Sequence, residues 1–411
     1  MRTNRRERGA TLALVAVCLL ALLAVAALAI DLGLLYVARS EAQRAADAAA
    51  LAGAEVFITS GCTSTGGCVA GGSQEPPARQ QAEAVGGEDY IDGTAASIQD
   101  SDISFSYPTP EEPQITVTVQ RTQARGDAVP TIFAKVFGAS SADVSVTAMA
   151  EAYNPTGGGA TIAVNCVAPF LVPNCDPAHL SPSTNPVCDG GAGDAGYFIN
   201  PNTGQIQNPQ LQPTGAIGEE WQLHTNTAPS QWYLVAFGGS QSAANERAWI
   251  AQCTPMVIAC NSTIQTMNGT KVGPTTQGVD DRIHASNQGP NNGQDTANVA
   301  TGPPFQITGG ANNPIPALIG QIYYGPSDSV VTVPVYDGHQ LNPGGDIVTV
   351  VGFMQLFINW ANHQSNTDLV DSYVLQVTPC NSGGGTPGAG PVTPDIVSTG
   401  GSPIPIRLIH P

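Results

Sequence analysis

The residues best suited to chemistry in this chain are its cysteines. One of the nine, Cys18, lies in an apolar N-terminal segment, and the other eight follow it. An even number of cysteines in an exported region suggests a disulfide framework, although the pairing is not fixed by sequence. Short spacing favours two local bridges, Cys62 with Cys68 and Cys253 with Cys260.

A zinc site is the alternative for part of this cysteine set. Its ligands would be Cys166, Cys175, His179 and Cys188, but their spacings are wider than those of the usual zinc knuckles. The six histidines are scattered, and none has a second histidine four residues further on. We therefore predict disulfides in preference to a metal.

Adjacent acidic residues give a weaker signal. Asp280-Asp281 and Glu219-Glu220 would point to opposite sides of a strand, and would bind Ca²⁺ only if loops brought further oxygens near. Solvated surface charge is the favoured interpretation. The sequence contains no G-x-S-x-G, H-E-x-x-H, Walker A or C-x-x-C motif. It therefore predicts no enzyme, with no catalytic residue, cofactor or metal ligand.

Charge is distributed unevenly along the 411 residues. The first nine hold Arg2, Arg5, Arg6 and Arg8 with a single acid, and the remainder holds 10 basic and 31 acidic residues, a net charge of about −21. Such a surface repels phosphate backbones, so nucleic acid is excluded as the expected partner. With 46 Gly and 33 Pro, the composition favours many turns and short strands.

A long apolar segment follows the arginines. Residues 10–30 carry no charge, and at 1.5 Å per residue they make a helix of about 31 Å, enough to cross a bilayer core. The arginines should stay cytoplasmic. We therefore expect a single-pass anchor in the inner membrane, with the later chain periplasmic or extracellular. The expected anchor residues include Ala10, Leu14, Leu20, Leu23 and Ile30.

Processing signals compete with an uncleaved anchor. The sequence ALA at 27–29 resembles a signal-peptidase site, but the apolar stretch is longer than a usual signal core. Gly9 follows basic residues, as in a type IV prepilin, yet the fifth position after it is Leu14 where such pilins usually carry Glu. Val17 before Cys18 does not suit a lipoprotein signal. We favour the uncleaved anchor.

The helix should continue beyond the membrane without a joint, because Ala is the best helix former. Small residues recur on one face at helical spacing. This packing stripe consists of Leu35, Ala38, Ala42, Ala45, Ala49 and Gly53. It packs either on the chain's own domain, which is the favoured interpretation, or laterally against copies or partners, as pilin helices do.

Two stretches carry a family resemblance. They are the span with IDLGLLYVARSEAQRAADAAALAGA (30–54) and TIFAKVFGASSADVSVTAMAEA (131–152). They resemble the TadG-like proteins of the Flp (Tad) pilus-assembly system, strongly over 8–55 and 131–152 and loosely elsewhere. The resemblance implies a membrane-anchored accessory protein of pilus assembly or adhesion, without an enzyme activity to carry over. Its implied partners are membrane lipid and other Tad/Flp assembly proteins or pilins, and the N-terminal helix could support homo-oligomers.

Longer members of that family carry a von Willebrand A module with a D-x-S-x-S metal site. This chain has Asp102, Ser104 and Ser106 at that spacing. However, the preceding stretch is polar, and Ile103, Phe105 and Tyr107 alternate with them, which is the pattern of a half-buried strand with Ser facing water. We therefore expect no metal site there.

The fold class we predict is α+β: a membrane helix continuing into a pilin-like helix-on-antiparallel-sheet domain, then a mostly β exported domain. The expected divisions are 1–9, 10–30, 31–153, 160–380 and a Gly/Pro-rich tail at 381–411, with a boundary at NPTGGG (154–159). Helices are expected at 78–85, 131–137, 243–252 and 314–320. Strands are expected at 102–107, 114–120, 143–153, 161–165, 231–237, 329–335, 347–353 and 372–378, with a polar excursion at 358–368.

Three functions remain open at this level. The favoured one is a non-enzymatic, membrane-anchored structural or assembly protein of a Flp (Tad) pilus or a related export or adhesion system. The first alternative is an adhesive or ligand-binding surface protein that shares only the anchor. The second is an exported hydrolase, which lacks a recognisable nucleophile and base in the sequence.

Overall fold

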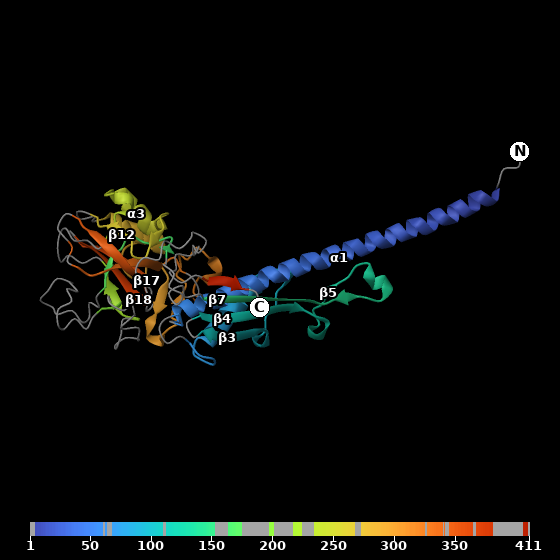
Figure 1. Cartoon of the computed structure of the whole chain (residues 1–411), viewed down its shortest axis with the longest axis horizontal. Helices are drawn as coiled ribbons and strands as arrows, with labels where there is room; N and C mark the ends of the chain where they lie inside the picture. The colour runs from blue at the N-terminus through green and yellow to red at the C-terminus, as the bar shows by residue number, and fades with distance from the viewer. Residues whose placement is uncertain are drawn as a thin grey trace.

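A single helix dominates the N-terminal part of the chain. The structure is a computed structural model that describes residues 5–60, 62–63, 68–109, 112–152, 163–174, 197–200, 217–223, 234–267, 273–324, 327–339, 341, 345–364, 367–380 and 406–409. For 5–13, Leu20, Thr59, Thr109, Thr301, Gln364 and Thr367 it describes the backbone alone. Helix α1 (Arg5–Thr59) is continuous over 55 residues. Its N-terminal part projects from the rest of the chain as a rod (Figure 1).

The C-terminal half of α1 lies on an antiparallel sheet. This sheet contains the neighbouring strands β3 (Ile103–Thr109), β4 (Glu112–Arg121) and β7 (Val144–Ala152), in the order β7-β4-β3. Burial alternates at every residue of β4, so that Ile115, Val117 and Val119 face the helix side of the sheet. Helix α2 (Glu75–Gly87) packs beside α1 and contains the helix predicted at 78–85.

The C-terminal end of the chain returns to this sheet. Strand β19 (Ile406–Ile409) pairs antiparallel with β7, Ile406 opposite Ala152 and Ile409 opposite Met149. The prediction of a tail over 381–411 is therefore wrong for these residues, because Ile406 packs on the α1 core and Arg407 bonds Glu151. We call α1 from Ala38, the elements up to β7 other than residues 129–142, and β19 the helix–sheet region.

A hairpin arm leaves the helix–sheet region and runs back along α1 (Figure 1). Its base is the pair β5 (Val129–Pro130) and β6 (Ser141–Ala142), and its tip holds the 3₁₀ turn η3 (Ala134–Phe137). The helix expected at 131–137 is therefore only this short turn. Pro130 belongs to β5 and does not begin it, while Gly138 ends it with φ 93°, a value that favours glycine.

The second region, residues 163–380, contains a larger sheet of order β10-β18-β17-β16-β9. Its centre is the long hairpin of β17 (Ile347–Gln364) and β18 (Thr367–Pro379). The prediction of a polar loop excursion at 358–368 is wrong, because the pairing runs on to Gln364 opposite Thr367. The other strands are β10 (Glu220–Gln222), β16 (Val330–Tyr336), β9 (Val172–Pro173), which is parallel to β16, and β12 (Thr263–Gln265), which pairs with β17.

Two helices pack against each other, and the second of them also packs against the β17–β18 hairpin. They are α3 (Ala243–Gln252), at the position predicted, and α4 (Pro274–Ile283). The helix expected at 314–320 is reduced to η8 (Pro316–Leu318). Of the strand expected at 161–165 the structure describes 163–165, where β8 spans Ala163–Val164. The remaining short elements of the described residues are β1 (Tyr90–Ile91), β2 (Thr94–Ala95), β11 (Ile258–Ala259), β13 (Thr296–Asn298), β14 (Gln306–Thr308) and β15 (Ile322–Tyr323), with 3₁₀ turns η1 (Asp100–Asp102), η2 (Gln123–Arg125), η6 (Phe237–Gly239) and η7 (Val299–Thr301).

The two regions touch through a few contacts. Gln376 of β18 donates from Nε2 to Thr63 Oγ1 at 3.0 Å, beyond the end of α1. Tyr324 packs against the core beneath α1. The boundary expected at 154–159 lies outside the described residues. The chain is therefore a long apolar helix followed by a mostly β structure with mixed α/β content.

Candidate functional site

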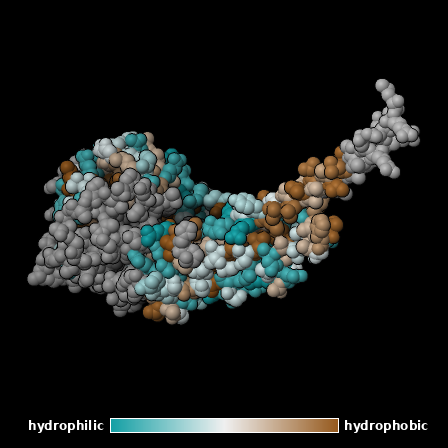
Figure 2. All heavy atoms as spheres, turned by 45° about the vertical axis from the view of Figure 1, so that its right-hand side comes forward, coloured by the Kyte–Doolittle hydropathy of each residue, from teal (hydrophilic) through white to brown (hydrophobic). Residues whose placement is uncertain are grey.

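The projecting part of α1 is the most apolar exposed surface among the described residues. It is long and apolar enough to cross a membrane, judged by length and composition. Of the predicted anchor residues, Leu14, Leu23 and Ile30 are 67%, 58% and 49% exposed, while Ala10 and Leu20 lie outside the described side chains. Figure 2 shows apolar side chains gathered where α1 leaves the helix–sheet region.

The apolar exposure does not stop at Asp31. Further along α1, Leu32 and Leu34 are exposed, and so are Tyr36 and Val37, at 77% and 54%. Arg39 is the next charged residue after Asp31. The surface therefore changes from apolar to charged at residue 39, eight residues beyond the point that the sequence pattern indicated.

Asp31 itself is buried, because the tip of the arm covers it. Its Oδ1 accepts the backbone N–H of Ile132 at 2.9 Å, and its Oδ2 accepts those of Phe133 at 3.0 Å and Ala134 at 2.5 Å. The side chain is only 3% exposed. The carboxylate thus takes up the free N–H groups at the start of a 3₁₀ turn, as capping side chains do. We call this contact the Asp31 clamp.

The packing stripe is covered by the chain's own elements. Ala38, Ala42, Ala45 and Ala49 are buried, Leu35 is partly buried, and the stripe forms one core with α2, β4 and β7. A Cβ on Gly53 would lie 2.4 Å from Ile115 Cδ1 and 3.1 Å from the Ala78 carbonyl oxygen. Small side chains are therefore required here for α1 to approach both neighbours. Lateral packing against other chains would have to use the helix before residue 38.

Three disulfides occur among the described cysteines. Cys62 bonds Cys68, at the C-terminal end of α1. The predicted bridge between Cys253 and Cys260 is wrong, because Cys253 pairs with Cys166 and Cys260 pairs with Cys380. The partners lie on segments that are distant in sequence and meet only in the fold, so the spacing of cysteines along the sequence does not predict these pairs. The disulfide leaves Cys166 unable to serve as a zinc ligand, and Cys175, His179 and Cys188 lie outside the described residues.

The D-x-S-x-S stretch has a structural role at the start of strand β3. Asp102 is buried and forms a 2.6 Å ion pair with Arg125, and it also accepts hydrogen bonds from Gln120 and the Gln99 backbone. Burial alone would raise the pKa of Asp102, but these three donors lower it overall. Ser104 is exposed on β3. The carboxylate oxygens that a metal would need are thus directed at protein donors.

The two pairs of adjacent acidic residues lie at different kinds of element. Asp280 and Asp281 lie on α4 and not on a strand, and Asp281 forms an ion pair with Arg247 of α3 at 2.7 Å. Burial, followed by the charges of Asp281 and Asp368, raises the pKa of Asp280 to about 6. Glu220 lies on β10 beside Asp371, whose pKa is raised to about 7, chiefly by burial. Within the described residues no group of three His, Cys, Asp or Glu side chains is arranged to hold a metal.

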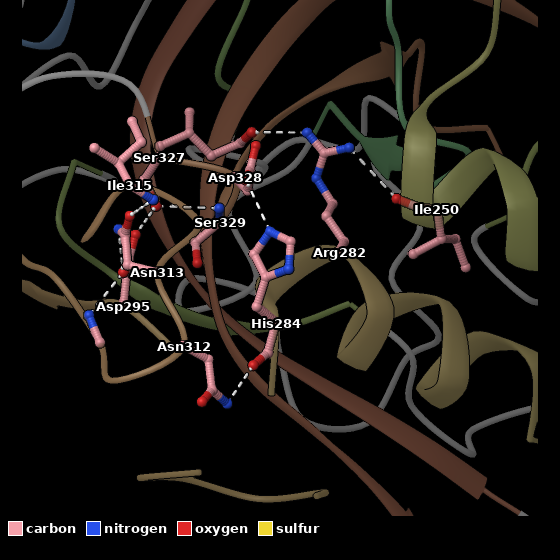
Figure 3. Close-up of polar contacts among 12 residues, drawn as sticks. Ile250, Arg282, His284, Asp295, Asn312, Asn313, Ile315, Ser327, Asp328 and Ser329 are labelled. Atoms are coloured by element: carbon pink, nitrogen blue, oxygen red, sulfur yellow. Dashed lines mark hydrogen bonds and ion pairs between the residues drawn. The ribbon is translucent and has the colours of Figure 1, made fainter. Parts of the chain in front are cut away.

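A buried polar cluster organises the loops of the second region (Figure 3). Asp295 accepts from Ser327 Oγ at 2.6 Å, Tyr323 Oη at 2.8 Å, Asn313 Nδ2 at 2.9 Å and the Gly310 N–H at 2.8 Å. Burial would raise the pKa of Asp295, but these donors lower it overall. Four protein donors thus occupy the carboxylate, and its role is structural.

Nearby, two basic side chains make further structural contacts (Figure 3). Arg282 donates to the backbone oxygens of Ile250 and Val330 at 3.4 and 3.2 Å, and His284 Nε2 lies 2.9 Å from Asp328. Both side chains thereby tie the end of α4 to the neighbouring α3 and to β16 with the turn before it. These contacts hold neighbouring segments together. Among the residues of this cluster, no nucleophile lies beside a base.

A shallow pocket of about 440 Å³ lies beside α2. Arg79, on its wall, donates to the carbonyl oxygens of Asp100 and Ile103 and stacks 5.1 Å from the Phe105 ring. Burial, followed by a hydrogen bond and charge from Asp100, raises the pKa of Glu83 in the same wall. The arginine is committed to joining α2 to β3, so the pocket has a structural explanation.

Comparison with known proteins adds one match, at the N-terminus. Residues 9–56 match the family model described as putative Flp pilus-assembly TadE/G-like. This segment is TadE/G-like. No curated protein and no solved structure matches the chain. The resemblance predicted from the sequence is therefore confirmed over the helix that carries the exposed apolar section, the Asp31 clamp and the packing stripe.

Sequence reasoning missed the Asp31 clamp and the arm that forms it. The signal in the sequence was a single charged residue at the end of a charge-free run, followed by more apolar positions before Arg39. A carboxylate in that place requires a partner, and the backbone N–H groups of Ile132 and Phe133, far along the chain, supply it. Nothing in the local pattern of either segment indicates the other.

Proposed function

We propose that this chain is a single-pass, membrane-anchored and non-enzymatic structural component of Flp (Tad) pilus assembly. The observation that carries the proposal is the coincidence of two features in one helix. The TadE/G-like match covers residues 9–56, and within it the exposed apolar helix gives way to the buried packing stripe at residue 38. Anchor and folded body are thus joined by one rigid helix.

The proposed orientation of the chain across the membrane follows from its charge distribution and its disulfides. The N-terminal arginines stay on the cytoplasmic side, and the disulfides require an oxidising compartment for the later chain. The helix–sheet region, which is pilin-like in laying a helix on an antiparallel sheet, then stands on the outer face of the inner membrane. The second region is carried further out and presents a surface to pilus subunits or other assembly proteins.

Deletion followed by complementation tests this proposal. Loss of pili in electron micrographs after deletion, restored by the full chain, is the expected result. A chain whose first 30 residues are replaced by a cleavable signal peptide should be exported and form its disulfides, yet should fail to restore pili, because the anchor is absent. Restoration of pili by this released chain would contradict the role of the anchor.

The same experiment separates the two alternatives. Normal pili with weakened surface attachment after deletion would indicate an anchored adhesive protein in place of an assembly component. Hydrolysis of a screened substrate by the purified full chain would indicate the exported enzyme.

A further inference from the structure

The exposed tip of the arm has a surface that the proposed anchor does not explain. Around the Asp31 clamp, Ile132, Phe133, Val136 and Phe137 are 58%, 38%, 81% and 81% exposed. Exposed apolar area costs on the order of 25 cal/mol per Å² in water, so four such side chains on one short turn indicate a partner that removes them from water.

The position of the tip along α1 identifies this partner. The tip is fixed at Asp31 by three backbone N–H groups, next to the exposed Ile30 and Leu32 of the helix. Its apolar side chains therefore lie at the same height as exposed apolar residues of the membrane helix. A lipid surface that covers the helix at this height also meets the tip.

The length of the apolar section supports the same conclusion. Residues 10–38 contain one charged residue, Asp31, and the clamp removes it from the surface. As a helix this section is about 43 Å long, which matches a bilayer with its headgroup layers, about 40–45 Å. Tyr36 is 77% exposed near its end, where aromatic side chains gather at membrane interfaces.

The depth of the clamp follows from its distance to the first exposed charge. Asp31 precedes Arg39 by eight residues, which is about 12 Å of helix. Each headgroup layer is about 5–8 Å thick. If Arg39 lies at the outer edge of this layer, Asp31 and the tip that covers it lie a few Å inside the acyl region. An apolar turn at this depth would be removed from water.

The backbone of the tip is prepared for a medium without water. The N–H groups of residues 132–134 bond Asp31, and that of Thr131 bonds the Ser140 oxygen at 3.1 Å. Those of Val136, Gly138 and Ala139 bond oxygens within the turn at 3.0–3.1 Å. Unpaired backbone groups are what exclude irregular loops from lipid, and this loop has internal acceptors for these donors.

We propose that the arm tip, residues 131–138, inserts into the outer leaflet of the bilayer that α1 crosses. Val136 and Phe137 enter the acyl boundary beside the helix, and Lys135, which is exposed on the same turn, reaches the lipid phosphates. The membrane then holds the protein at two points, α1 and the arm, and fixes the rotation of the helix–sheet region about the helix axis. This inference rests on the proposed anchoring by α1.

Depth-dependent quenching in proteoliposomes tests the proposal on the full chain. Cys18, the free cysteine among the described residues, is replaced by Ser, and this background must take up no thiol-reactive fluorophore. Single cysteines are then introduced as Phe137→Cys at the tip, Leu23→Cys in the anchor and Tyr90→Cys as the matched control. All three positions are at least 58% exposed, and Tyr90 lies on a hairpin tied to Glu41 and Arg44, beyond the apolar section.

The expected result is strong quenching of the label at 137 by lipids spin-labelled near the headgroup, quenching at 23 by lipids labelled deep in the chain, and neither at 90. Quenching at 23 without quenching at 137 would overturn the arm's insertion and leave the anchor intact. Absence of quenching at both positions would overturn the anchor as well. Equal quenching at 137 and 90 would indicate general adsorption and would also overturn the proposal.

Discussion

The helix–sheet region and the second region are stabilised by different means. The first has a core rich in Ala along α1, closed by two close approaches at Gly53 and Gly86, and its disulfide joins residues only six apart. The second has a core of aromatic and branched side chains, and its two described disulfides join residues 87 and 120 apart. The first region therefore depends on how closely a helix can approach, and the second on covalent closure of long loops.

The difference follows from what each region must carry. A helix that is anchored in lipid at one end needs a stiff, tightly packed connection to the folded region at the other end. Small side chains allow the closest packing of the helix on its neighbours. A mostly β structure built from short, distant strands gains more from cross-links, because long loops lose the most entropy on closure. Each region can be disturbed by a change that should leave the other intact.

The largest expected effect is the loss of the Cys260–Cys380 bridge. On loop entropy, replacing both cysteines by Ser should cost the second region about 5 kcal/mol, against about 2 kcal/mol for the Cys62–Cys68 pair. Denaturant unfolding followed by tryptophan fluorescence reports on the second region, since all four tryptophans lie beyond residue 220. Equal shifts of this transition for both pairs would show that the regions are not held separately.

The next effect concerns the seating of α1. Gly53→Leu should cost the helix–sheet region about 3 kcal/mol, because the added side chain meets Ile115 and the Ala78 backbone. Gly33→Leu on the same helix is the matched control, since a Cβ there meets nothing within 4 Å. The thermal transition of the helical circular-dichroism signal measures both. A destabilisation by Gly33→Leu as large as that by Gly53→Leu would contradict close packing at the stripe.

A smaller, local effect is expected at the clamp. Asp31→Ala leaves three backbone N–H groups of the arm without their acceptor, at a cost of about 2 kcal/mol. Hydrogen exchange at residues 132–134 should speed up accordingly, while β4 and β7 stay protected. Asp47→Ala is the control, because Asp47 accepts a partly buried bond from Gln43 within α1 and none from the arm. Unchanged exchange at the arm after Asp31→Ala would show that the clamp does not hold it.

The smallest effect is the pH dependence that Glu55 gives to the stability of the helix–sheet region. Burial raises the pKa of Glu55 to about 7. The folded state therefore binds this proton more tightly than the unfolded state, and the associated stability is complete below about pH 4.5 and lost as the pH rises through 7. Glu55→Gln should raise the free energy of unfolding by about 1–2 kcal/mol at pH 8 and change it little at pH 4. A gain of the same size at both pH values would rule out this explanation.

The sequence predicts the elements whose pattern is local. The alternation in β4, the Ala spacing of α1 and the helix within α2 each follow from neighbouring residues. The outer part of the β17–β18 hairpin does not follow from neighbouring residues, because its polar side chains bond partners far along the chain. Asn359 bonds Asp371 on the facing strand, and Asp368 accepts N–H groups at the start of α4. The polar residues in this part of the hairpin therefore belong to paired strands and not to a loop.

Other features depend on contacts that no local pattern contains. Strand β19 has four residues, and its pairing with β7 joins segments more than 250 residues apart, as the bond between Arg407 and Glu151 shows. The two long disulfides and the Asp31 clamp are of the same kind. The charge of Asp31 predicts an apolar surface that ends at Ile30, yet the clamp buries that charge and extends the exposed apolar surface to Val37.

Helix α1 is expected to stay in the mature chain and to cross the membrane, and everything proposed for the arm and the outer regions depends on this. Native Cys18, which is exposed on α1, reports on it directly. The protein in intact membranes is treated with a membrane-impermeant maleimide from both sides, and the peptide containing Cys18 is then measured by mass spectrometry. We predict that this peptide is present and unlabelled, and that it becomes labelled once detergent is added. Labelling in the intact membrane, or a mature chain that begins after Ala29, would contradict a membrane-spanning α1.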